Sequence, residues 1–541
     1  MKNQIKYFAL FCLAIISLMF PDRASAYDFE YNGLYYDVVS LQDMTCALTK
    51  GTDEYKGTVV IPAEVEYNNR KFKVTAVNGN PLLKVENLTI PNTINEIHLN
   101  SYYLGKLTIQ DGEIALKITG GYVSPKTLKT IYLGRDIQMT DNLFAYHNIE
   151  EITIGPLVTV ISKGLFTSNR KLSHITFSNN GKLMRIEESA FSYCDAISTI
   201  ILPNSVEYIG GSAFYNNPKL NKIELSQNLK SIGRWAFYDC PLITNITLPL
   251  YLEDIGHSAF RECSIKELTI PKSVNQIGEY AFSDNPLSIV TLEDADKTIS
   301  FDSNALPSVN SAYIGRNFIG TIKANKIDIG LSVSALNFRN FRDSKNLTSI
   351  SIPESVKTID NEVFYYCSSL ESLEIPSSVT YVGTSAFYGC TNLKSISFGS
   401  NIKDIGANAL TKCDNLSEIT LFNTVPPSYL TAFTNKQYMD VALKVPHGSL
   451  TAYQNTDNWK NFWNITEMEA SGISEIKTDN ISILTDANSI LITGAEAEDA
   501  VTIVGIDGNI RYSGYDRIIS GLTPGLYVVK VRNCTRKVIV K

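Results

Sequence analysis

The chain has 541 residues with 48 basic and 55 acidic side chains, a formal net charge of −7 at pH 7. A chain of net negative charge is repelled by nucleic acid and by anionic membrane surfaces, so neither is expected as its main partner. Its 44% hydrophobic content and 29 tyrosines favour a large, β-rich protein with a buried core.

Residues 1–26 have the pattern of a secretory signal peptide. Lys2 and Lys6 precede an apolar run at 7–20 that is too short to span a bilayer comfortably, and Ala24-Ser-Ala26 forms a small-residue cleavage site. We expect cleavage before Tyr27, which leaves 45 basic and 54 acidic residues and a net charge of −9. No later segment is apolar enough for a transmembrane helix, so the mature chain is expected to be secreted or displayed on the outer cell surface, as a monomer.

Residues 27–80 are predicted to form an N-terminal β cap. Apolar and polar residues alternate around Asn32-Gly33, a hairpin turn signal, and further strands are expected at 57–62 and 72–77. A stack of repeats exposes an unpaired apolar end, so a differently patterned cap is physically required there.

Residues 81–425 carry an internal repeat. Phe191, Phe214, Phe237 and Phe260 are each 23 residues apart, a period typical of stacked-repeat solenoids. A six-residue frame, apolar-x-x-apolar-x-apolar, predicts 16 strands, which close at Ile90, Ile109, Leu133, Ile154, Phe177, Leu202, Leu225, Leu248, Ile270, Leu292, Ile314, Ile329, Ile352, Ile375, Phe398 and Leu421. The interval from Ile314 to Ile329 is only 15 residues, so an irregularity is expected there.

Each turn of the predicted solenoid has similar residues where its strand ends and its corner begins. Proline often follows the strand and ends its pairing, Ile-Gly then allows a tight corner, and Ala-Phe drives a ring into the interior. The pieces are too short for a classical helix, so the corner is expected to be a β-turn or a 3₁₀ turn.

The full pattern is Leu-x-x-Ile-x-Ile-Pro-x-Ser-Val-x-x-Ile-Gly-x-x-Ala-Phe-x-x-Cys, nearly complete at 265–282, 370–390 and 393–413. It resembles the BspA-like leucine-rich repeat family of secreted and surface proteins. The resemblance implies a curved right-handed solenoid and, for some members, adhesion to extracellular-matrix proteins or to other cells. It implies no catalytic residues.

The repeat frame stops after Leu421. Residues 426–468 hold two of the three tryptophans and are predicted to be a C-terminal cap, similar to that of BspA-like proteins, with an aromatic carbohydrate-stacking site as the alternative. Residues 469–480 are predicted to be a linker. Residues 481–541 alternate in short strands with Gly turns, the pattern of a small β-sandwich. The run at 522–531 with the terminal 537–541 resembles the C-terminal sorting domain of type IX secretion in Bacteroidetes, and a small Ig-like accessory domain is the alternative.

The sequence offers no catalytic, metal or cofactor site, and the chain is predicted not to be an enzyme. Six cysteines, each three residues after the aromatic position, form a column with one thiol per turn, and they are interpreted as buried free thiols used as small hydrophobes. The Gly-x-Ser sequences lack the second glycine of a nucleophile elbow, so they are interpreted as corner residues.

Two surfaces are candidates for binding. One is the outward side of the strands, with Lys222, Glu224, Thr247, Glu267 and Thr269. The other is the corner, where Tyr215, Tyr238, Tyr365 and Tyr388 directly follow a repeat phenylalanine. The predicted function is therefore a non-catalytic, adhesin-like scaffold that binds a protein of a host or of the extracellular matrix, or other cells. Glycan binding is the alternative, and an exported hydrolase is a further, less favoured alternative.

Overall fold

The computed structural model describes residues 27–139, 144–429, 431–469, 482–486, 489–493, 498–505, 509–523, 525–531 and 534–540. The predicted signal peptide and residues 470–480 of the predicted linker lie outside the described residues. The chain forms two compact units, Met1–Lys444 with Ala452–Ile465, and Val445–Thr451 with Thr466–Lys541.

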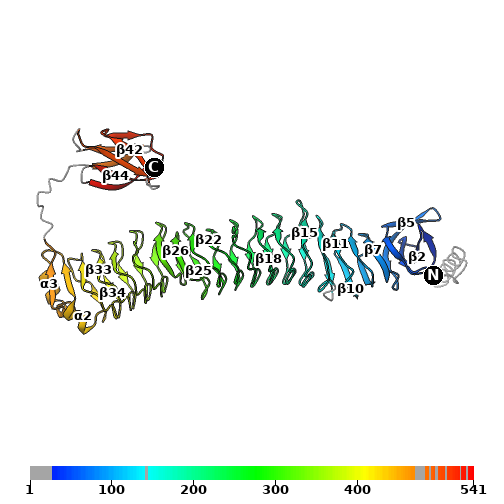
Figure 1. Cartoon of the computed structure of the whole chain (residues 1–541), viewed down its shortest axis with the longest axis horizontal. Coiled ribbons are helices and arrows are strands. Elements are labelled where there is room, and N and C mark those ends of the chain that lie inside the picture. The colour runs from blue at the N-terminus through cyan, green and yellow to red at the C-terminus, as the bar shows by residue number, and fades with distance from the viewer. Residues whose placement is uncertain are drawn as a thin grey trace, which may run out of the picture. The chain divides into compact units, whose positions relative to one another are not determined.

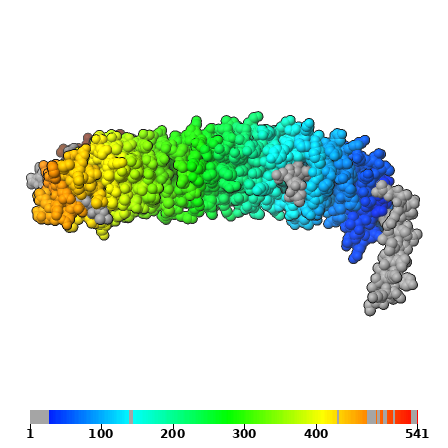
Figure 2. Space-filling model, turned by 90° about the horizontal axis from the view of Figure 1, so that it is seen from below, coloured from blue at the N-terminus to red at the C-terminus, as the bar shows by residue number. Residues whose placement is uncertain are grey.

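The first unit is an elongated solenoid (Figure 1). This confirms the predicted fold class, a mostly β solenoid of about 16 turns with a 23-residue period. Figure 2 shows that the stacked turns follow one another in sequence order along a gently curved rod.

The N-terminal end starts with a five-stranded sheet of order β1-β2-β3-β6-β5. Asn32 and Gly33 both have positive φ, 52° and 78°, and join the first two strands in a tight hairpin, as a two-residue turn requires. The strands are β1 (Phe29–Tyr31), β2 (Leu34–Ser40), β3 (Thr45–Thr49), β5 (Glu64–Tyr67) and β6 (Arg70–Val77).

One side of most turns contributes a strand to what we call the strand face. Its parallel strands are β4 (Lys56–Val60), β7 (Lys84–Ile90), β9 (Lys106–Ile109), β11 (Thr130–Leu133), β13 (Glu151–Ile154) and β15 (His174–Phe177), then β17 (Thr199–Ile201) and β19 (Lys222–Glu224), then β22 (Glu267–Ile270), β24 (Ile289–Leu292), β26 (Val309–Ile314) and β28 (Ala324–Ile329), then β31 (Ser372–Ile375), β33 (Ser395–Phe398), β35 (Glu418–Leu421), β37 (Ala442–Val445) and β38 (Asn464–Glu467). β4 lies in the segment predicted as the N-terminal cap and β37 in that predicted as the C-terminal cap. Each end segment therefore extends the strand face by pairing with the last regular strand.

Fourteen of the sixteen predicted frames contain a strand of this face, and two do not. The frames that close at Leu248 and Ile352 have no strand, and residues 244–248, all within the described chain, make no backbone hydrogen bond to a neighbouring turn. The strand face is therefore interrupted.

A second set of parallel strands leads into the predicted Ile-Gly turns, and in the regular turns each strand ends at the isoleucine of that pair or at its equivalent. These short strands are β8 (Glu96–Ser101), β10 (Leu116–Val123) and β12 (Ile137–Met139), then β14 (Val160–Ile161), β16 (Arg185–Ile186), β18 (Tyr208–Ile209), β20 (Ser231–Ile232), β21 (Asp254–Ile255), β23 (Gln276–Ile277), β25 (Ile299–Phe301) and β27 (Phe318–Ile319), then β29 (Ala335–Leu336), β30 (Thr358–Ile359), β32 (Tyr381–Val382), β34 (Asp404–Ile405) and β36 (Ser428–Tyr429). The break between β27 and β29 falls at the predicted irregularity. There Phe301 and Phe318 meet edge to face, at an interplanar angle of 87°.

Two arginines are fully buried inside the solenoid, which the sequence analysis did not foresee. The guanidinium of Arg135 donates to the carbonyls of Pro91 and Ile94, both at 2.8 Å, and that of Arg316 donates to the carbonyl of Pro271 at 2.8 Å. Burial lowers the pKa of both guanidinium groups. Each guanidinium thus gives several buried backbone carbonyls a side-chain donor.

The C-terminal end of the solenoid contains helices that were not predicted. These are α2 (Asn435–Asp440), α3 (Leu450–Asn455) and the 3₁₀ helix η1 (Trp459–Asn461). Thr434 and Gln437 form a capping box at the start of α2. Trp459 is buried, donates to the carbonyl of Pro427 at 2.7 Å and stacks on Phe462, so this segment covers the last turn as a lid.

In the second unit, seven antiparallel strands form two sheets of order β39-β40-β43 and β42-β41-β44-β45. The strands are β39 (Ser482–Asp486), β40 (Ser489–Thr493), β41 (Val501–Gly505), β42 (Ile510–Gly514), β43 (Ile518–Ser520), β44 (Gly525–Val531) and β45 (Cys534–Val540). Ile490 and Ile492 of one sheet share a buried core with Val501, Ile503 and Val529 of the other.

Candidate binding surface

The corner of each turn, the segment around Ala-Phe, has a backbone conformation that alternates in hand. In the turn of Phe191 the residues two before and two after the ring, Ser189 and Tyr193, have φ of 57° and 56°. The amides of Ser189, Phe191 and Tyr193 donate to the next turn, at the carbonyls of 211, 213 and 215, over 2.8 to 2.9 Å. The corners therefore form their own ladder of cross-turn hydrogen bonds, independent of the strand face.

The phenylalanine of each corner points into the solenoid and stacks on its equivalents. Phe214 and Phe237 have ring centroids 5.2 Å apart and nearly parallel planes, and Phe237 and Phe260 are 5.1 Å apart. Because the ring is fixed inside and the chain bends directly after it, the following residue is placed on the outer side of the corner.

This placement brings the predicted tyrosines together in pairs. Tyr215 and Tyr238 stack with centroids 5.1 Å apart and an interplanar angle of 6°, and Tyr193 lies 5.3 Å beyond Tyr215 in a tilted arrangement. Arg261 follows in the next turn, with its guanidinium carbon 5.9 Å from the centroid of Tyr238. Parallel rings at this distance are offset, so each ring covers only part of its neighbour's face.

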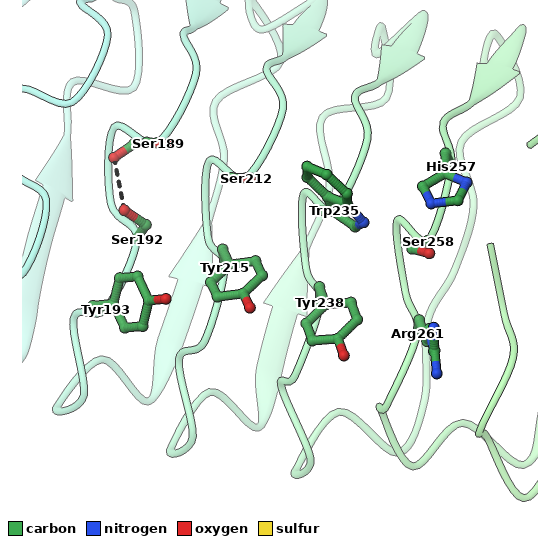
Figure 3. A pocket seen from close by; sticks show the side chains of 10 residues that line it. All are labelled: Ser189, Ser192, Tyr193, Ser212, Tyr215, Trp235, Tyr238, His257, Ser258 and Arg261. Atoms are coloured by element: carbon green, nitrogen blue, oxygen red, sulfur yellow. Dashed lines mark hydrogen bonds between the residues drawn. The ribbon is translucent and has the colours of Figure 1, made fainter. Parts of the chain in front are cut away.

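A second row of side chains faces this ladder across a groove of about 510 Å³ (Figure 3). Figure 3 shows Trp235 and His257 on one side, and Tyr193, Tyr215, Tyr238 and Arg261 on the other, with serines between them. The groove is lined by Ser189, Ser192, Tyr193, Ser212, Tyr215, Trp235, Tyr238, His257, Ser258 and Arg261, and we call it the tyrosine groove.

Most charged groups around the tyrosine groove are paired with one another. Tyr238 donates its hydroxyl to Glu262 at 2.6 Å, and this hydrogen bond together with burial raises the pKa of Tyr238 to about 12. Arg261 binds Asp284 at 2.7 Å, and His257 lies 3.8 Å from Glu279. What the groove offers to a ligand is therefore chiefly aromatic surface, hydroxyls and the indole N–H of Trp235.

The other two predicted tyrosines form a shorter ladder. Tyr365 and Tyr388 stack at 4.9 Å with an interplanar angle of 6°. Arg342 lies over the outer face of this pair at Tyr365, 4.3 Å from the ring centroid, and Lys412 lies 5.3 Å from the centroid of Tyr388. Both outer faces are thus occupied by cations of the protein itself, which leaves less ring surface for a ligand than in the tyrosine groove.

The five candidates of the strand face are all exposed and lie apart from the tyrosine groove. Lys222 and Glu224 pair with each other at 2.8 Å. Glu224 and Thr247 line a second hollow, of about 550 Å³, with Ile201 on its wall. Glu267 and Thr269 follow on β22. The sequence-predicted residues therefore divide between two separate surfaces.

The cysteine column is buried and free, and its thiols also make hydrogen bonds. The Sγ of Cys240 lies 3.3 Å from the carbonyl oxygen of Phe214, and the Sγ of Cys390 lies 3.2 Å from that of Phe364. In three turns that lack the cysteine, asparagine takes the position, and Asn217 donates to the carbonyls of Phe191 and Phe214 at 3.0 and 2.7 Å. The interpretation of the thiols as small hydrophobes alone is thus incomplete, because the position needs a donor.

The structure adds Tyr193, Trp235, His257 and Arg261 to the candidates, and sequence reasoning missed them. Trp235 takes the place two residues before the phenylalanine that is Ser189, Ser212 and Ser258 in neighbouring turns. The available signal was a bulky ring at a position that is serine in the turns directly before and after it.

Three features of the described residues bear on catalysis and on membrane insertion. That part of the chain holds no group of three or more His, Cys, Asp or Glu side chains arranged to bind a metal ion. Ser212, Ser258 and Ser385 of the Gly-x-Ser sequences all have positive φ, 54°, 51° and 55°, as corner residues. Within the same ranges, no helix has the length and apolarity needed to cross a membrane.

A family model described as the BspA type leucine rich repeat region matches residues 81–173, 137–247, 230–314 and 312–440. No curated protein matches the chain. Among solved structures, a leucine-rich repeat protein from Bacteroides ovatus is 22% identical, covers 75% of this chain and 100% of its own, and gives a TM-score of 0.38. A leucine rich cell surface protein from Faecalibacterium prausnitzii is 21% identical over 73% of this chain and 94% of its own, with a TM-score of 0.26. The pneumococcal vaccine antigen PcpA is 17% identical over 82% of this chain and 98% of its own, also with a TM-score of 0.26.

Proposed function

The chain belongs to the BspA-type leucine-rich repeat proteins, and from this premise we propose that it is an exported, non-catalytic scaffold that binds a protein ligand at the cell exterior. Leucine-rich repeat surface proteins are generally binding or adhesin-like scaffolds, which supports this proposal. The ligand is a protein of the extracellular matrix or of another cell, and it docks on the corners of the solenoid.

The tyrosine groove is the observation that carries the proposal. Tyrosine, tryptophan and arginine dominate binding energy at protein interfaces, because they bury a large area at low entropic cost and keep a polar tip. The groove presents three tyrosines, Trp235 and Arg261 over consecutive turns, held rigidly by the phenylalanine ladder behind them. The strand face offers threonine, glutamate and lysine, residues that are depleted or energetically minor at interface centres.

The test compares the two surfaces within one protein. The double variant Tyr215→Ala/Tyr238→Ala is expected to lose binding to immobilised extracellular-matrix proteins about thirtyfold or more, the size of a hot-spot loss. The matched strand-face variant, Thr247→Ala/Glu267→Gln, keeps its affinity. Loss of binding in the strand-face variant alone, or saturable binding to no matrix protein, would contradict the proposal.

Glycan binding is the second candidate, and one exposed ring favours it. Trp463 is 77% exposed beside the lid that buries Trp459, so it presents a flat aromatic face to solvent. A glycan array probed with the native chain and with Trp463→Ala tests this candidate. A glycan signal that Trp463→Ala abolishes would place sugar recognition at the lid.

We propose that residues 1–26 direct export and that the seven-stranded C-terminal unit is either a sorting domain of the type IX kind or an Ig-like accessory domain. Its two antiparallel sheets around one core suit both. Whole-cell proteolysis of the full-length chain and of a chain that ends at Met468 separates the two. Equal surface exposure of both chains would exclude the sorting role.

A further inference from the structure

We propose that the solenoid contains two copies of one four-turn clamp module, each locked by a buried arginine, and that its strand face opens first in the stretch between them. The first module runs from β7 to β14, residues 84–161, and the second from β22 to β29, residues 267–336 (Figure 1). Such a device belongs to the scaffold itself and is independent of the ligand that the tyrosine groove binds.

The loops that lead from the strand face to the second set of strands have the same lengths, in the same order, in both modules. They hold five, six, three and five residues. In the first module they are residues 91–95, 110–115, 134–136 and 155–159, and in the second they are 271–275, 293–298, 315–317 and 330–334. No other loop of this kind in the described chain has fewer than five residues, so the three-residue loop marks the module.

The three-residue loop is Gly134-Arg-Asp136 in the first module and Gly315-Arg-Asn317 in the second. The five-residue loop at the start of each module buries an aliphatic side chain, Ile94 or Val274, whereas the short loop buries its arginine instead. A Cβ on either glycine would lie 2.4 Å from a backbone atom of the preceding turn, so the close approach of the short loop requires glycine there.

The guanidinium of each arginine reaches two turns back, to equivalent carbonyls. These belong to the first, second and fourth residues of the loop at the start of the module, and the six hydrogen bonds are 2.8 to 3.2 Å long. The acceptors are Pro91, Asn92 and Ile94 for Arg135, and Pro271, Lys272 and Val274 for Arg316. One planar group with several donors thus joins the first turn of the module to the third.

Two further sets of hydrogen bonds recur at equivalent positions. Tyr132 donates its hydroxyl to Asp111 at 2.8 Å, and Tyr313 donates to Asp294 at 3.0 Å, which ties the second turn to the third. The residue after each arginine accepts from two amides of the fourth turn, at 2.7 to 3.2 Å. The pairs are Asp136 with Thr159 and Val160, and Asn317 with Ser334 and Ala335. The general 23-residue repeat requires none of these contacts, so the two stretches are copies of one unit.

A buried guanidinium resists separation of the turns that it joins. Any movement that parts the first turn from the third takes the carbonyls away from a charge that is still buried, at a cost well above that of a neutral hydrogen bond.

The strand face is unbroken within both modules. The strands β7, β9, β11 and β13 pair in sequence, as do β22, β24, β26 and β28, and no break between the four sheets of the strand face falls inside either set. Two of the three breaks, after β15 and after β19, lie between the modules, in the stretch 162–266 that carries the tyrosine groove. The clamps therefore hold the two ends of this stretch, and the unclamped strand face between them is the part that opens most readily.

The experiment follows amide hydrogen exchange by mass spectrometry in the full-length chain, with each module as the control for the other. Arg135→Met keeps much of the side-chain volume and removes every donor, so we expect β9 and β11 to exchange about 100-fold faster or more while β24 and β26 are unchanged. Arg316→Met gives the reverse pattern. The matched variant Arg185→Met removes an exposed arginine between the modules and changes neither. In the native chain, β17 and β19 are expected to exchange at least about tenfold faster than these four strands.

Unchanged exchange in both methionine variants of the modules overturns the proposal, because the arginines then act by volume alone. Equal acceleration along the whole solenoid also overturns it, since a clamp acts within its own module. Native β17 and β19 that exchange as slowly as β9 and β11 contradict opening between the modules. If Arg135→Met does not fold, Tyr132→Phe takes its place, because it removes only the bond to Asp111. About tenfold faster exchange confined to β9 and β11 is then expected, and no local change overturns the proposal.

Discussion

The corners and the strand face of the solenoid use the same repeat in different ways. The corners keep a cross-turn ladder through most successive turns, with amides that donate to the next turn at 2.7 to 3.4 Å and phenylalanines that stack at 5.1 to 6.5 Å. The strand face, in contrast, breaks into four sheets, and in the described chain the frames that close at Leu248 and Ile352 contain no strand.

This difference shows where the solenoid is held together. The Ala-Phe pair of the corner recurs in most turns because it must pack against the turn before and the turn after, whereas the outward strand residues contact mainly solvent. A surface over the corners is therefore rigid, and one over the strand face is less so. Rigid side chains lose little entropy when a ligand binds, so this difference favours the tyrosine groove as the binding surface.

Amide hydrogen exchange should show the largest contrast between the two regions. The amide of Phe237 donates to the carbonyl of Ala259 at 2.8 Å, whereas Ile246 and Thr247 make no backbone hydrogen bond to a described residue. We expect Phe237 to be protected by a factor on the order of 10³ or more relative to Ile246 and Thr247, because exchange there requires unfolding of the stack. Equal protection would mean that the strand face is as firmly paired as the corners.

Truncation of a corner phenylalanine should cost the most stability of any single change. Phe237→Ala is expected to lower the free energy of unfolding by about 3–5 kcal/mol, since the ring is fully buried between Phe214 and Phe260. Thr247→Ala on the strand face is expected to stay within about 0.5 kcal/mol of the native chain. Urea unfolding followed by circular dichroism measures both, and similar losses in the two variants would remove the distinction.

The asparagine in the donor column should rank next. Asn217→Ala leaves the carbonyl of Phe191 without its side-chain donor, leaves that of Phe214 with the Cys240 thiol alone and removes the acceptor of the Cys194 amide, at an expected cost of about 2–3 kcal/mol. Asn217→Cys restores one donor, as in neighbouring turns, and is expected to recover about half of the loss. If cysteine were no better than alanine, the thiols of the column would act by size alone.

The thiols should make stability fall at high pH. Burial raises the pKa of Cys194, Cys240, Cys367 and Cys413 to about 12 from an ordinary value of 9.0. The folded thiol thus stays protonated where the unfolded one ionises, so its contribution is complete below pH 9 and is lost as pH rises from 9 toward 12. Between pH 9 and 10 each thiol is expected to cost about 1 kcal/mol, measured as a drop in the urea midpoint.

A variant with these four cysteines changed to serine provides the control. Serine keeps a donor for the phenylalanine carbonyls and does not ionise in this range, so the variant is expected to show a flatter pH dependence. An unchanged slope would assign the loss to other groups.

Much of the fold could be predicted because the repeat is strict. The 23-residue step of the phenylalanines fixes the solenoid and its period, and the position after Phe214 and Phe237 is enough to pair Tyr215 with Tyr238. The short interval before Ile329 likewise marked the irregular turns in advance.

What could not be predicted depends on contacts between positions that differ from turn to turn. Trp235 and Tyr238 are three residues apart, yet they form opposite sides of a groove, in a corner where Trp235 and Asp239 both have a φ of 55°. The burial of Arg135 depends on carbonyls more than 40 residues earlier, at Pro91 and Ile94. The sequence before Leu248 matches the repeat frame like its neighbours, so nothing in it indicates that the strand is missing there.

The corner ladder also gives the solenoid a net peptide dipole along its axis. In it every cross-turn N–H points toward the C-terminal turns and every accepting carbonyl points back, as with Ser189 to Gly211 and Tyr193 to Tyr215. In the parallel strands the two groups alternate, so their peptide dipoles largely cancel, whereas those of the corners add. The column therefore carries partial positive charge at its C-terminal end and partial negative charge at its N-terminal end, the reverse of an α-helix. The two ends of the corner ladder therefore carry opposite partial charges. A capping segment that complements the charge at one end does not complement it at the other.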